Sequence, residues 1–176
     1  LMRLKDQVAI VTGAASGFGA EIARRYVAEG AKVAVADINE EGAKAIAASL
    51  GSSAIAVRCD VSKRADINSL VTTTVKHFGT LDVVVNNAGF THKNSSMLDV
   101  DEETFDRMFD INVKSIYLMT QAVVPILRAK KRGCIINVGS VSGMRPRPGL
   151  VWYAASKAAV NLMSKAMAVE LGPDNI

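Results

Sequence analysis

Tyr153 and Lys157 are the residues of this sequence whose types and spacing are best suited to proton transfer. They stand four residues apart, which places both side chains on one face of a helix. A free tyrosine hydroxyl titrates near pH ~10, and a nearby ammonium lowers that pKa toward neutrality. Ser140, thirteen residues before the tyrosine, could hold a reacting oxygen against the hydroxyl. In isolation, however, a Tyr-x-x-x-Lys pair is a common helical pair, so its meaning depends on the rest of the chain.

A glycine-rich turn follows the first apolar run, at residues 12–19 with the sequence Thr-Gly-Ala-Ala-Ser-Gly-Phe-Gly. Glycines at 13, 17 and 19 would permit a sharp turn, the close approach of a phosphate, and tight packing of a helix on a strand. Backbone N–H groups and the positive end of a helix dipole favour a diphosphate there. Because strand, glycines, helix and second strand come in the required order, the turn predicts a dinucleotide site rather than a purely structural turn.

Asp37 ends the second predicted strand, eighteen residues after Gly19. A carboxylate at this position can accept hydrogen bonds from both ribose hydroxyls of NAD and would repel the 2′-phosphate of NADP. Ile38 follows it, where an NADP site would favour an arginine or lysine nearby. The sequence therefore predicts NAD, and the alternative is a solvent-facing aspartate at the end of a strand.

These motifs together resemble the short-chain dehydrogenase/reductase family over essentially the whole chain. The turn at 12–19 matches the family's Thr-Gly-x-x-x-Gly-x-Gly pattern, and residues 153–157 match its Tyr-x-x-x-Lys signature. Asp60-Val61 is similar to its adenine-binding pair, and residues 86–89 match its Asn-Asn-Ala-Gly motif. All of them come in family order.

The resemblance implies an NAD-dependent oxidoreductase in which hydride passes between substrate carbon and nicotinamide while Tyr153 moves the proton. The implied catalytic residues are Asn112, Ser140, Tyr153 and Lys157, with Asn112 holding a water in a proton relay beyond the lysine. The expected cofactor-binding residues are Gly13, Ser16, Gly17, Phe18, Gly19, Asp37, Ile38, Asp60, Val61, Asn87, Ala88, Gly89, Tyr153 and Lys157. For Asn87 a purely structural role, pinning the end of a strand, is the alternative.

The elements that must position these residues alternate along the chain. Short β-branched runs predict strands at 8–11, 32–36, 54–58, 81–86 and 134–138, and longer stretches predict helices at 18–29, 40–50, 64–77, 102–128 and 152–171. This alternation favours an α/β fold, a doubly wound parallel sheet of the Rossmann type with strand order 3-2-1-4-5. We expect one domain over 1–176, with strands six and seven absent from the sequence and the natural protein longer.

The predicted helix 102–128 carries its apolar residues on one stripe, with Asp101 as a plausible N-cap. Asn112 lies on that same stripe, where a polar residue needs a reason. Either it satisfies backbone groups inside a bent helix, or it joins the catalytic set, and the two roles are compatible. Pro125 should distort the helix as well.

The composition excludes several classes of protein. The chain has 176 residues, 49% of them hydrophobic and 22% charged, with a net charge of +4. No apolar segment is long enough to span a bilayer, and the basic cluster 130–132 has no interleaved aromatic residues, so neither a membrane nor a nucleic acid is an expected partner. We expect a cytoplasmic protein without a metal, in which Cys59 and Cys134 are buried, unpaired apolar residues.

Substrate identity is not readable from these residues. The leading hypothesis is a sugar or other secondary-alcohol dehydrogenase. A 3-oxoacyl-carrier-protein reductase is the nearest alternative. Asp37 argues against it, because that reaction usually uses NADPH, whereas Asp37 favours NAD. A non-catalytic dinucleotide-sensing regulator is a third. The family's usual homotetramer is expected, with Tyr117, Val124, Met163 and Met167 available on second apolar faces of the two long helices.

Overall fold

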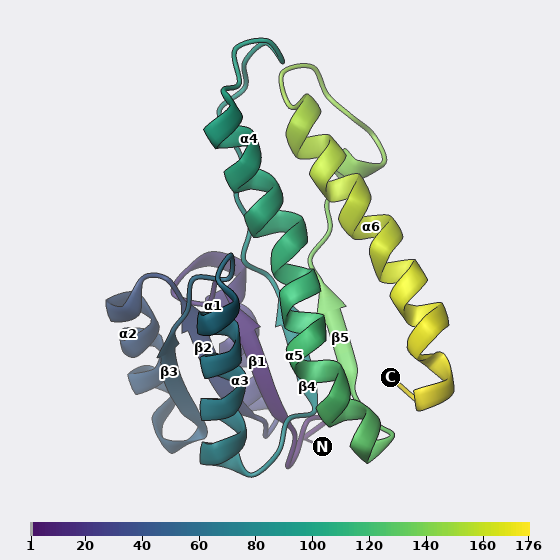
Figure 1. The fold of residues 1–176 in the computed structure, drawn as a ribbon. Coiled ribbons are helices and arrows are strands. Elements are labelled where there is room, and N and C mark those ends of the chain that lie inside the picture. Colours follow the sequence, from purple (N-terminus) through teal and green to yellow (C-terminus); the bar gives the residue numbers. More distant parts are fainter. Residues whose placement is uncertain (1) are drawn as a thin grey trace.

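A computed structural model describes residues 2–176 as a parallel five-stranded sheet flanked by helices on both faces (Figure 1). The strands are β1 (Val8–Thr12), β2 (Lys32–Asp37), β3 (Ala54–Arg58), β4 (Val83–Asn86) and β5 (Cys134–Asn137). Their order is β3-β2-β1-β4-β5, and every neighbouring pair is parallel. The predicted fold class and strand order are thereby confirmed; β3 has its predicted bounds, and the other strands each differ at an end by one or two residues.

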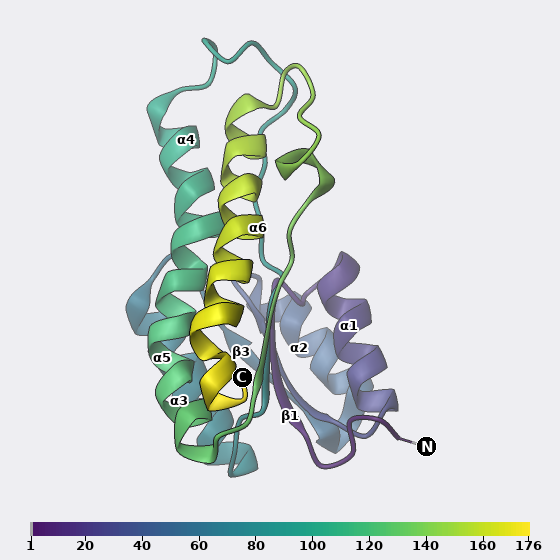
Figure 2. The ribbon, with the colours of Figure 1, turned by 90° about the vertical axis from the view of Figure 1, so that its right-hand side faces the viewer.

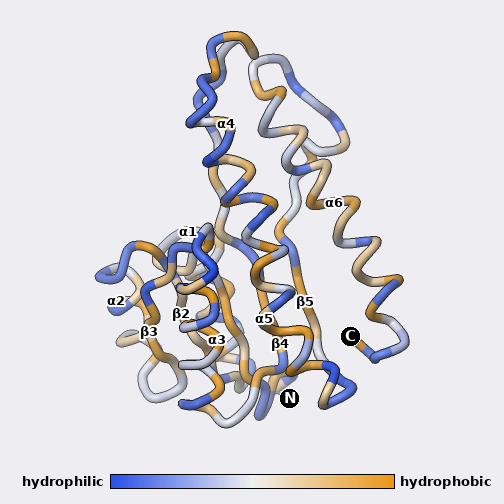
Figure 3. The backbone as a smooth tube through the Cα atoms, viewed as in Figure 1, coloured by the Kyte–Doolittle hydropathy of each residue, from blue (hydrophilic) through white to orange (hydrophobic). Residues whose placement is uncertain are grey.

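The helices divide between the two faces of the sheet (Figure 2). They are α1 (Gly17–Ala28), α2 (Glu40–Leu50), α3 (Arg64–Phe78), α4 (Glu102–Phe109), α5 (Ser115–Lys130) and α6 (Val151–Leu171). One buried apolar cluster joins β1 and β2 to α1 and α2, and a second joins the same strands to α3 and α5. Hydrophobic residues accordingly follow the strands, while many of the turns between elements are hydrophilic (Figure 3). Alternate side chains of each central strand thus feed two cores.

The two cysteines differ in environment. Cys59 is buried just after β3, as expected, whereas Cys134 is exposed at the start of β5, so the expectation that both are buried is wrong. β5 forms one edge of the described sheet, and its exposed and half-buried residues alternate instead of forming a buried run. Both thiols are free, as the strand order predicts.

The long helix predicted over 102–128 is one helical column in Figure 1, but it is not uniformly α-helical. A π-helical segment, Asp110–Lys114, separates α4 from α5, and Asn112 lies buried within it. The side chain of Asp101 caps α4 by accepting a hydrogen bond from the Thr104 N–H, as predicted. α5 continues through Pro125 as far as Lys130. The polar residue on the apolar stripe therefore lies at the irregular turn of the helix. π-Helical turns are frequent at functional sites, which makes Asn112 a candidate site residue on this ground as well.

α6 ends in a 3₁₀ turn at Gly172–Asp174, in agreement with the helix stop expected at Gly172 and Pro173. Within residues 2–176, no helix is long and apolar enough to cross a membrane.

Asp82, just before β4, is the most deeply buried carboxylate in the charge pairs of the described chain, at 3% exposure. It accepts a hydrogen bond from the Val8 N–H at 2.9 Å and pairs with Lys130 and with Arg132. Burial favours the neutral acid, but the hydrogen bonds from Lys130 and Val8 outweigh it and lower the pKa of Asp82. The carboxylate thus ties β1, β4 and the end of α5 together at the edge opposite the glycine turn.

We expect Asp82→Ala to lower the free energy of unfolding at pH 7 by about 2–4 kcal/mol, because it leaves the Val8 N–H without its acceptor and Lys130 without its carboxylate partner. A lowered folded-state pKa adds stability that is present above the unfolded value near ~4 and is lost as pH falls through the folded value. Urea unfolding at pH 7 and pH 3 checks both points. The gap between wild type and variant should narrow at pH 3, and a constant gap would show that the charge is not responsible.

Candidate active site

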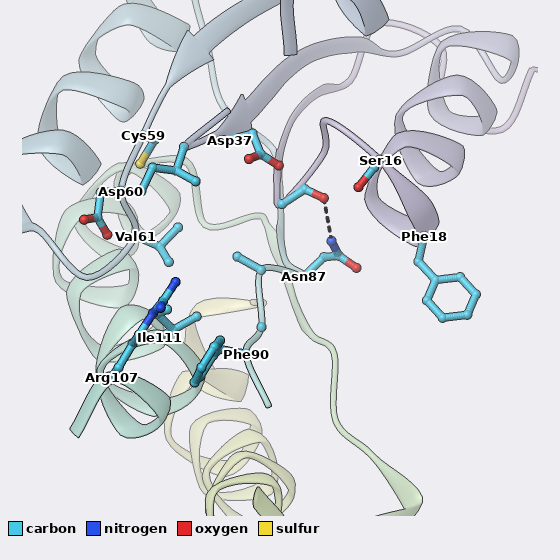
Figure 4. Close-up of a pocket in the computed structure, with 14 residues that line it drawn as sticks. Ser16, Phe18, Asp37, Cys59, Asp60, Val61, Asn87, Phe90, Arg107 and Ile111 are labelled. Carbon is cyan, nitrogen blue, oxygen red and sulfur yellow. Dashed lines mark hydrogen bonds between the residues drawn. The ribbon is translucent and has the colours of Figure 1, made fainter. Parts of the chain in front are cut away.

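A cleft of about 430 Å³ opens at the carboxyl edge of the sheet, above β1, β2 and β4 (Figure 4). Its lining is Gly13, Ser16, Phe18, Asp37, Ile38, Cys59, Asp60, Val61, Asn87, Ala88, Gly89, Phe90, Arg107 and Ile111. Ten of the expected cofactor-binding residues are in this lining; Gly17, Gly19, Tyr153 and Lys157 are not. The structure therefore brings together residues from five separate stretches of sequence, at the edge where ligands bind in doubly wound sheets.

The three glycines of the turn differ in what a side chain at each position would meet. Gly13 has a positive φ of +63°, and a Cβ there would lie 2.8 Å from the Cα of Ala88. Gly17 also has a positive φ, +55°, but a Cβ there would meet no atom within 4 Å. A Cβ on Gly19 would lie 2.2 Å from the Gly13 carbonyl oxygen. Gly13 and Gly19 thus allow backbone to pack on backbone, while the space beside Gly17 leaves room for a ligand.

The N-terminus of α1 fits an anionic group. Ser16 is the N-cap residue, yet its side chain makes no capping hydrogen bond, and it lines the cleft. The first turn of α1 has no acidic residue. No acidic side chain of the first turn and no capping hydroxyl therefore offsets the positive end of the helix dipole. Free N–H groups of this kind suit the binding of a diphosphate.

Asp37 holds the turn as well as lining the cleft. One carboxylate oxygen accepts a hydrogen bond from the Ala15 N–H at 3.0 Å, and the other accepts one from the Asn39 N–H at 2.9 Å. The side chain of Asn39 in turn caps α2. Each carboxylate oxygen can accept a further hydrogen bond, so Asp37 can meet ribose hydroxyls while fixing its neighbours. The alternative of a merely solvated aspartate does not describe these contacts.

Asp60 and Val61 form the wall of the cleft after β3. One oxygen of the Asp60 carboxylate accepts hydrogen bonds from the Ser62 N–H and hydroxyl, at 2.9 and 2.7 Å. Partial burial favours its neutral form, but these hydrogen bonds dominate and lower the pKa of Asp60. Val61 is buried. The pair offers an ionised acceptor and an apolar surface side by side.

Asn87 pins the end of β4 to the end of β1. Its amide nitrogen donates to the carbonyl oxygens of Thr12 and Gly13 at 2.8 and 3.1 Å, and its N–H donates to the Thr12 hydroxyl. The structural role considered for Asn87 is thus present, at a residue that also lines the cleft. Thr12 was not among the expected site residues, although its hydroxyl also accepts from the Ala88 N–H.

Asn112 joins the cleft to α6. Its side-chain oxygen accepts from the Phe90 N–H at 2.8 Å, and its amide nitrogen donates to the Phe90 carbonyl at 2.9 Å and to the Ser156 hydroxyl at 3.0 Å. The Ser156 hydroxyl donates to the Tyr153 carbonyl. All the polar atoms of the Asn112 side chain are therefore engaged in positioning. Ser156 was missed in the sequence, where only its place beside Lys157 could have indicated it.

Lys157 is buried and donates a hydrogen bond to the Val138 carbonyl at 2.8 Å. Burial lowers the pKa of its ammonium. A Cβ on Gly89 would lie 3.5 Å from the Asn112 side-chain oxygen and 3.7 Å from the Lys157 nitrogen. Gly89 also lines the cleft, so this glycine is the point where the expected catalytic residues reach the expected cofactor site.

Ser140 and Tyr153 lie on the α6 side of the site, outside the cleft lining described for residues 2–176. Ser140 begins a 3₁₀ turn, Val141–Gly143, and its hydroxyl accepts from the Ser142 N–H. The Ser140 carbonyl accepts from the amide of Asn161, one turn beyond Lys157. The turn packs closely on α6, since a Cβ on Gly143 would lie 2.6 Å from the Lys157 carbonyl carbon. Asn161 is a second positioning residue absent from the sequence-based list.

Comparison with known proteins agrees with this arrangement. The family model for the short chain dehydrogenase matches residues 7–176. The chain belongs to the short-chain dehydrogenase family. The resemblance inferred from the motifs is confirmed, and with it the prediction that the chain is an oxidoreductase.

Two curated relatives and one solved structure show how close the similarity is. The 4-formylbenzenesulfonate dehydrogenase of Comamonas testosteroni is 47% identical, over 99% of this chain and 71% of its own length. The 2,5-dichloro-2,5-cyclohexadiene-1,4-diol dehydrogenase of Sphingobium indicum is 40% identical, over 96% of this chain and 68% of its own. The crystal structure of 3-ketoacyl-(acyl-carrier-protein) reductase from Brucella melitensis with NADH has 43% identity and a TM-score of 0.96, covering 98% of this chain and 73% of that one.

Proposed function

We propose that this short-chain dehydrogenase binds NAD(H) in the cleft and interconverts a secondary alcohol, such as a sugar or polyol, and the corresponding carbonyl compound. The observation that carries the proposal is the composition of the cleft, in which the glycine turn and Asp37 share one lining with Asp60 and Asn87. The neighbouring reductase structure with NADH at 43% identity supports the choice of cofactor.

Each end of the cofactor has residues suited to it. The uncapped N-terminus of α1 and the space beside Gly17 suit the diphosphate. Asp37 would accept hydrogen bonds from the ribose hydroxyls, and Asp60 with Val61 would hold the adenine. When bound, the cofactor supplies or accepts the hydride.

The chain's own residues would handle the proton. Tyr153 would exchange a proton with the substrate oxygen, and Ser140 would hold that oxygen by a hydrogen bond. Burial lowers the pKa of the Lys157 ammonium, and this ammonium would attract the negative charge that develops on the Tyr153 oxygen during proton transfer. Asn112 would keep Phe90 and α6 in place through its three hydrogen bonds, beside any role in a proton relay.

A 3-oxoacyl-carrier-protein reductase is the second candidate, favoured by the TM-score of 0.96 to such a reductase. That structure was solved with NADH, so the argument from Asp37 does not separate the two candidates. The relative named as a cyclic-diol dehydrogenase supports the first candidate, because the hydroxyls of such a diol are secondary alcohols. Initial rates on a panel of polyols, aryl aldehydes and a β-ketoacyl thioester, with NAD(H) and NADP(H), distinguish them.

Assembly and location are parts of the same proposal. We infer a homotetramer formed through α4–α5 and α6, whose outer faces expose Tyr117 and Leu162. Val124, which was expected on such a face, is instead 8% exposed within the chain. The cytoplasm is the compartment we predict.

We expect wild type to bind NADH at least tenfold more tightly than NADPH, because a carboxylate about 5 Å from a 2′-phosphate costs about 3 kcal/mol at an effective dielectric constant near 20. Asp37→Asn should narrow that ratio, since it removes the charge and keeps one acceptor oxygen for the turn. Fluorescence titration of the two reduced cofactors measures the ratio. Equal affinities in wild type would contradict the choice of NAD.

A further inference from the structure

Arg107 lies on α4, away from every motif discussed above, yet its side chain lines the cleft. Its guanidinium carbon lies 4.4 Å from the centre of the Phe90 ring. In Figure 4, Arg107, Phe90 and Ile111 lie together, on the side of the cleft away from Ser16 and Phe18. Arg107 therefore belongs to the part of the cleft that is distant from the glycine turn.

The guanidinium of Arg107 lines a cavity together with carboxylates but forms an ion pair with none of them. A second cavity of about 620 Å³ adjoins the cleft, and its lining includes Glu103, Asp106 and Asp110. Asp110 pairs instead with Lys114, at 3.0 Å. Among residues 2–176, no carboxylate oxygen is within ion-pair distance of Arg107. An exposed arginine that lies over a ring rather than beside an acid leaves its other planar face available for a flat partner.

The main chain of Phe90, the residue beside that guanidinium, is held by Asn112. Both its N–H and its carbonyl are hydrogen-bonded to the Asn112 side chain, at 2.8 and 2.9 Å. Asn112 is itself buried in the π-helical segment that follows α4. The main chain that carries the Phe90 ring is thereby tied to the same helical column that carries Arg107, which places the ring and the guanidinium beside each other.

An exposed apolar side chain also lines both cavities. Ile38, directly after Asp37, is 59% exposed and lines both cavities. Asp60, Arg107 and Ile111 also line both cavities. The junction of the two cavities thus has an isoleucine, an acceptor carboxylate and a planar cation around it, a combination that suits a flat nitrogen heterocycle with an exocyclic amine.

We propose that Arg107 is a cofactor-binding residue that stacks on the adenine ring, with Phe90 behind it and Ile38 across from it. The inference rests on the proposed function, since it takes the cofactor to lie in the cleft with adenine at Asp60 and Val61. Arg107 then contributes to affinity for the adenosine half of the cofactor and not for the nicotinamide half.

The test compares ligands that contain one half of the cofactor. Fluorescence titration with NADH and with reduced nicotinamide mononucleotide, and displacement of NADH by ADP, are measured for wild type and Arg107→Ala. We expect the variant to raise the Kd of NADH and of ADP about tenfold, the size typical of a lost stacking contact, and to leave the mononucleotide within about twofold. Arg64→Ala is the matched control, because Arg64 also lies over a ring, that of Tyr117, but outside the cleft lining.

Arg107→Lys distinguishes the effect of stacking from the effect of charge. It is also the variant to measure if Arg107→Ala does not fold. A lysine keeps the charge but not the plane, so we expect it to lose most of the ADP affinity. Wild-type ADP affinity in Arg107→Lys would overturn the proposal in favour of a purely electrostatic role, and a loss confined to NADPH would overturn it in favour of 2′-phosphate binding. An equal loss for the mononucleotide would show that Arg107 acts only by shaping the cleft. If wild type binds neither NADH nor NADPH, it is the proposed function that fails.

Discussion

Tyr153→Phe should abolish most turnover while NADH binding stays within about twofold of wild type. The phenyl ring keeps the packing of a half-buried residue on α6, whereas the lost hydroxyl is the group proposed to move the proton. Proton transfer by a positioned side chain contributes about a hundredfold to ten-thousandfold. We therefore expect kcat to fall by about three orders of magnitude. Steady-state rates and NADH fluorescence titration on the same samples measure the two quantities.

Lys157→Ala is the informative companion, because its ammonium reaches the Val138 carbonyl and lies near Gly89 in the cleft. It should impair both turnover and NADH binding, which separates it from Tyr153→Phe. If Tyr153→Phe keeps most of its activity, the assignment of the acid and base is wrong. If instead it loses NADH binding, Tyr153 serves mainly to hold the cofactor.

Of the glycine-to-alanine substitutions in the glycine turn, Gly19→Ala is expected to disrupt the cofactor site most. Its Cβ would lie 2.2 Å from the Gly13 carbonyl oxygen and 2.6 Å from the Asn87 amide nitrogen. The turn, Asn87 or α1 must move to relieve those contacts, and overpacking of this kind costs about 1–3 kcal/mol. Because misplacement by ~1 Å can cost about a hundredfold, we expect kcat/KM to fall at least that much. Thermal unfolding and steady-state kinetics measure the two effects.

Gly172→Ala is the matched control for the added methyl group. Gly172 follows α6 with a φ of −53°, and a Cβ there would meet no atom within 4 Å. It should leave stability and kinetics close to wild type. Wild-type kcat/KM in Gly19→Ala would mean that the turn does not bind the part of the substrate or cofactor on which the rate depends.

The sequence by itself determined the elements and the identity of the family. Apolar runs and glycine positions are local signals, and each β-strand or helix begins within about two residues of its predicted start, except α5, which the sequence did not separate from α4. The meeting of the expected cofactor residues at the ends of β1, β2 and β4 could also be predicted, because parallel strands bring their carboxyl ends to one edge. The motifs that identify the family are contiguous stretches of sequence, so they can be recognised without knowledge of any tertiary contact.

Contacts between distant segments were decided only by the tertiary structure. The spacing of Asn112 in the sequence shows a polar residue on an apolar stripe, but not that its partners are the main chain of Phe90 and the hydroxyl of Ser156, 22 and 44 residues away. Asn161 is similar, since its link to Ser140 exists only because the 3₁₀ turn packs on α6. Arg107 matches no motif. It lines the cleft only because the helical column places α4 beside the loop that follows β4, which contains Phe90. The exposure of Cys134 is a different case. The predicted strand order already placed β5 at an edge of the sheet, but its alternating exposed and half-buried residues became clear only from the packing around that strand.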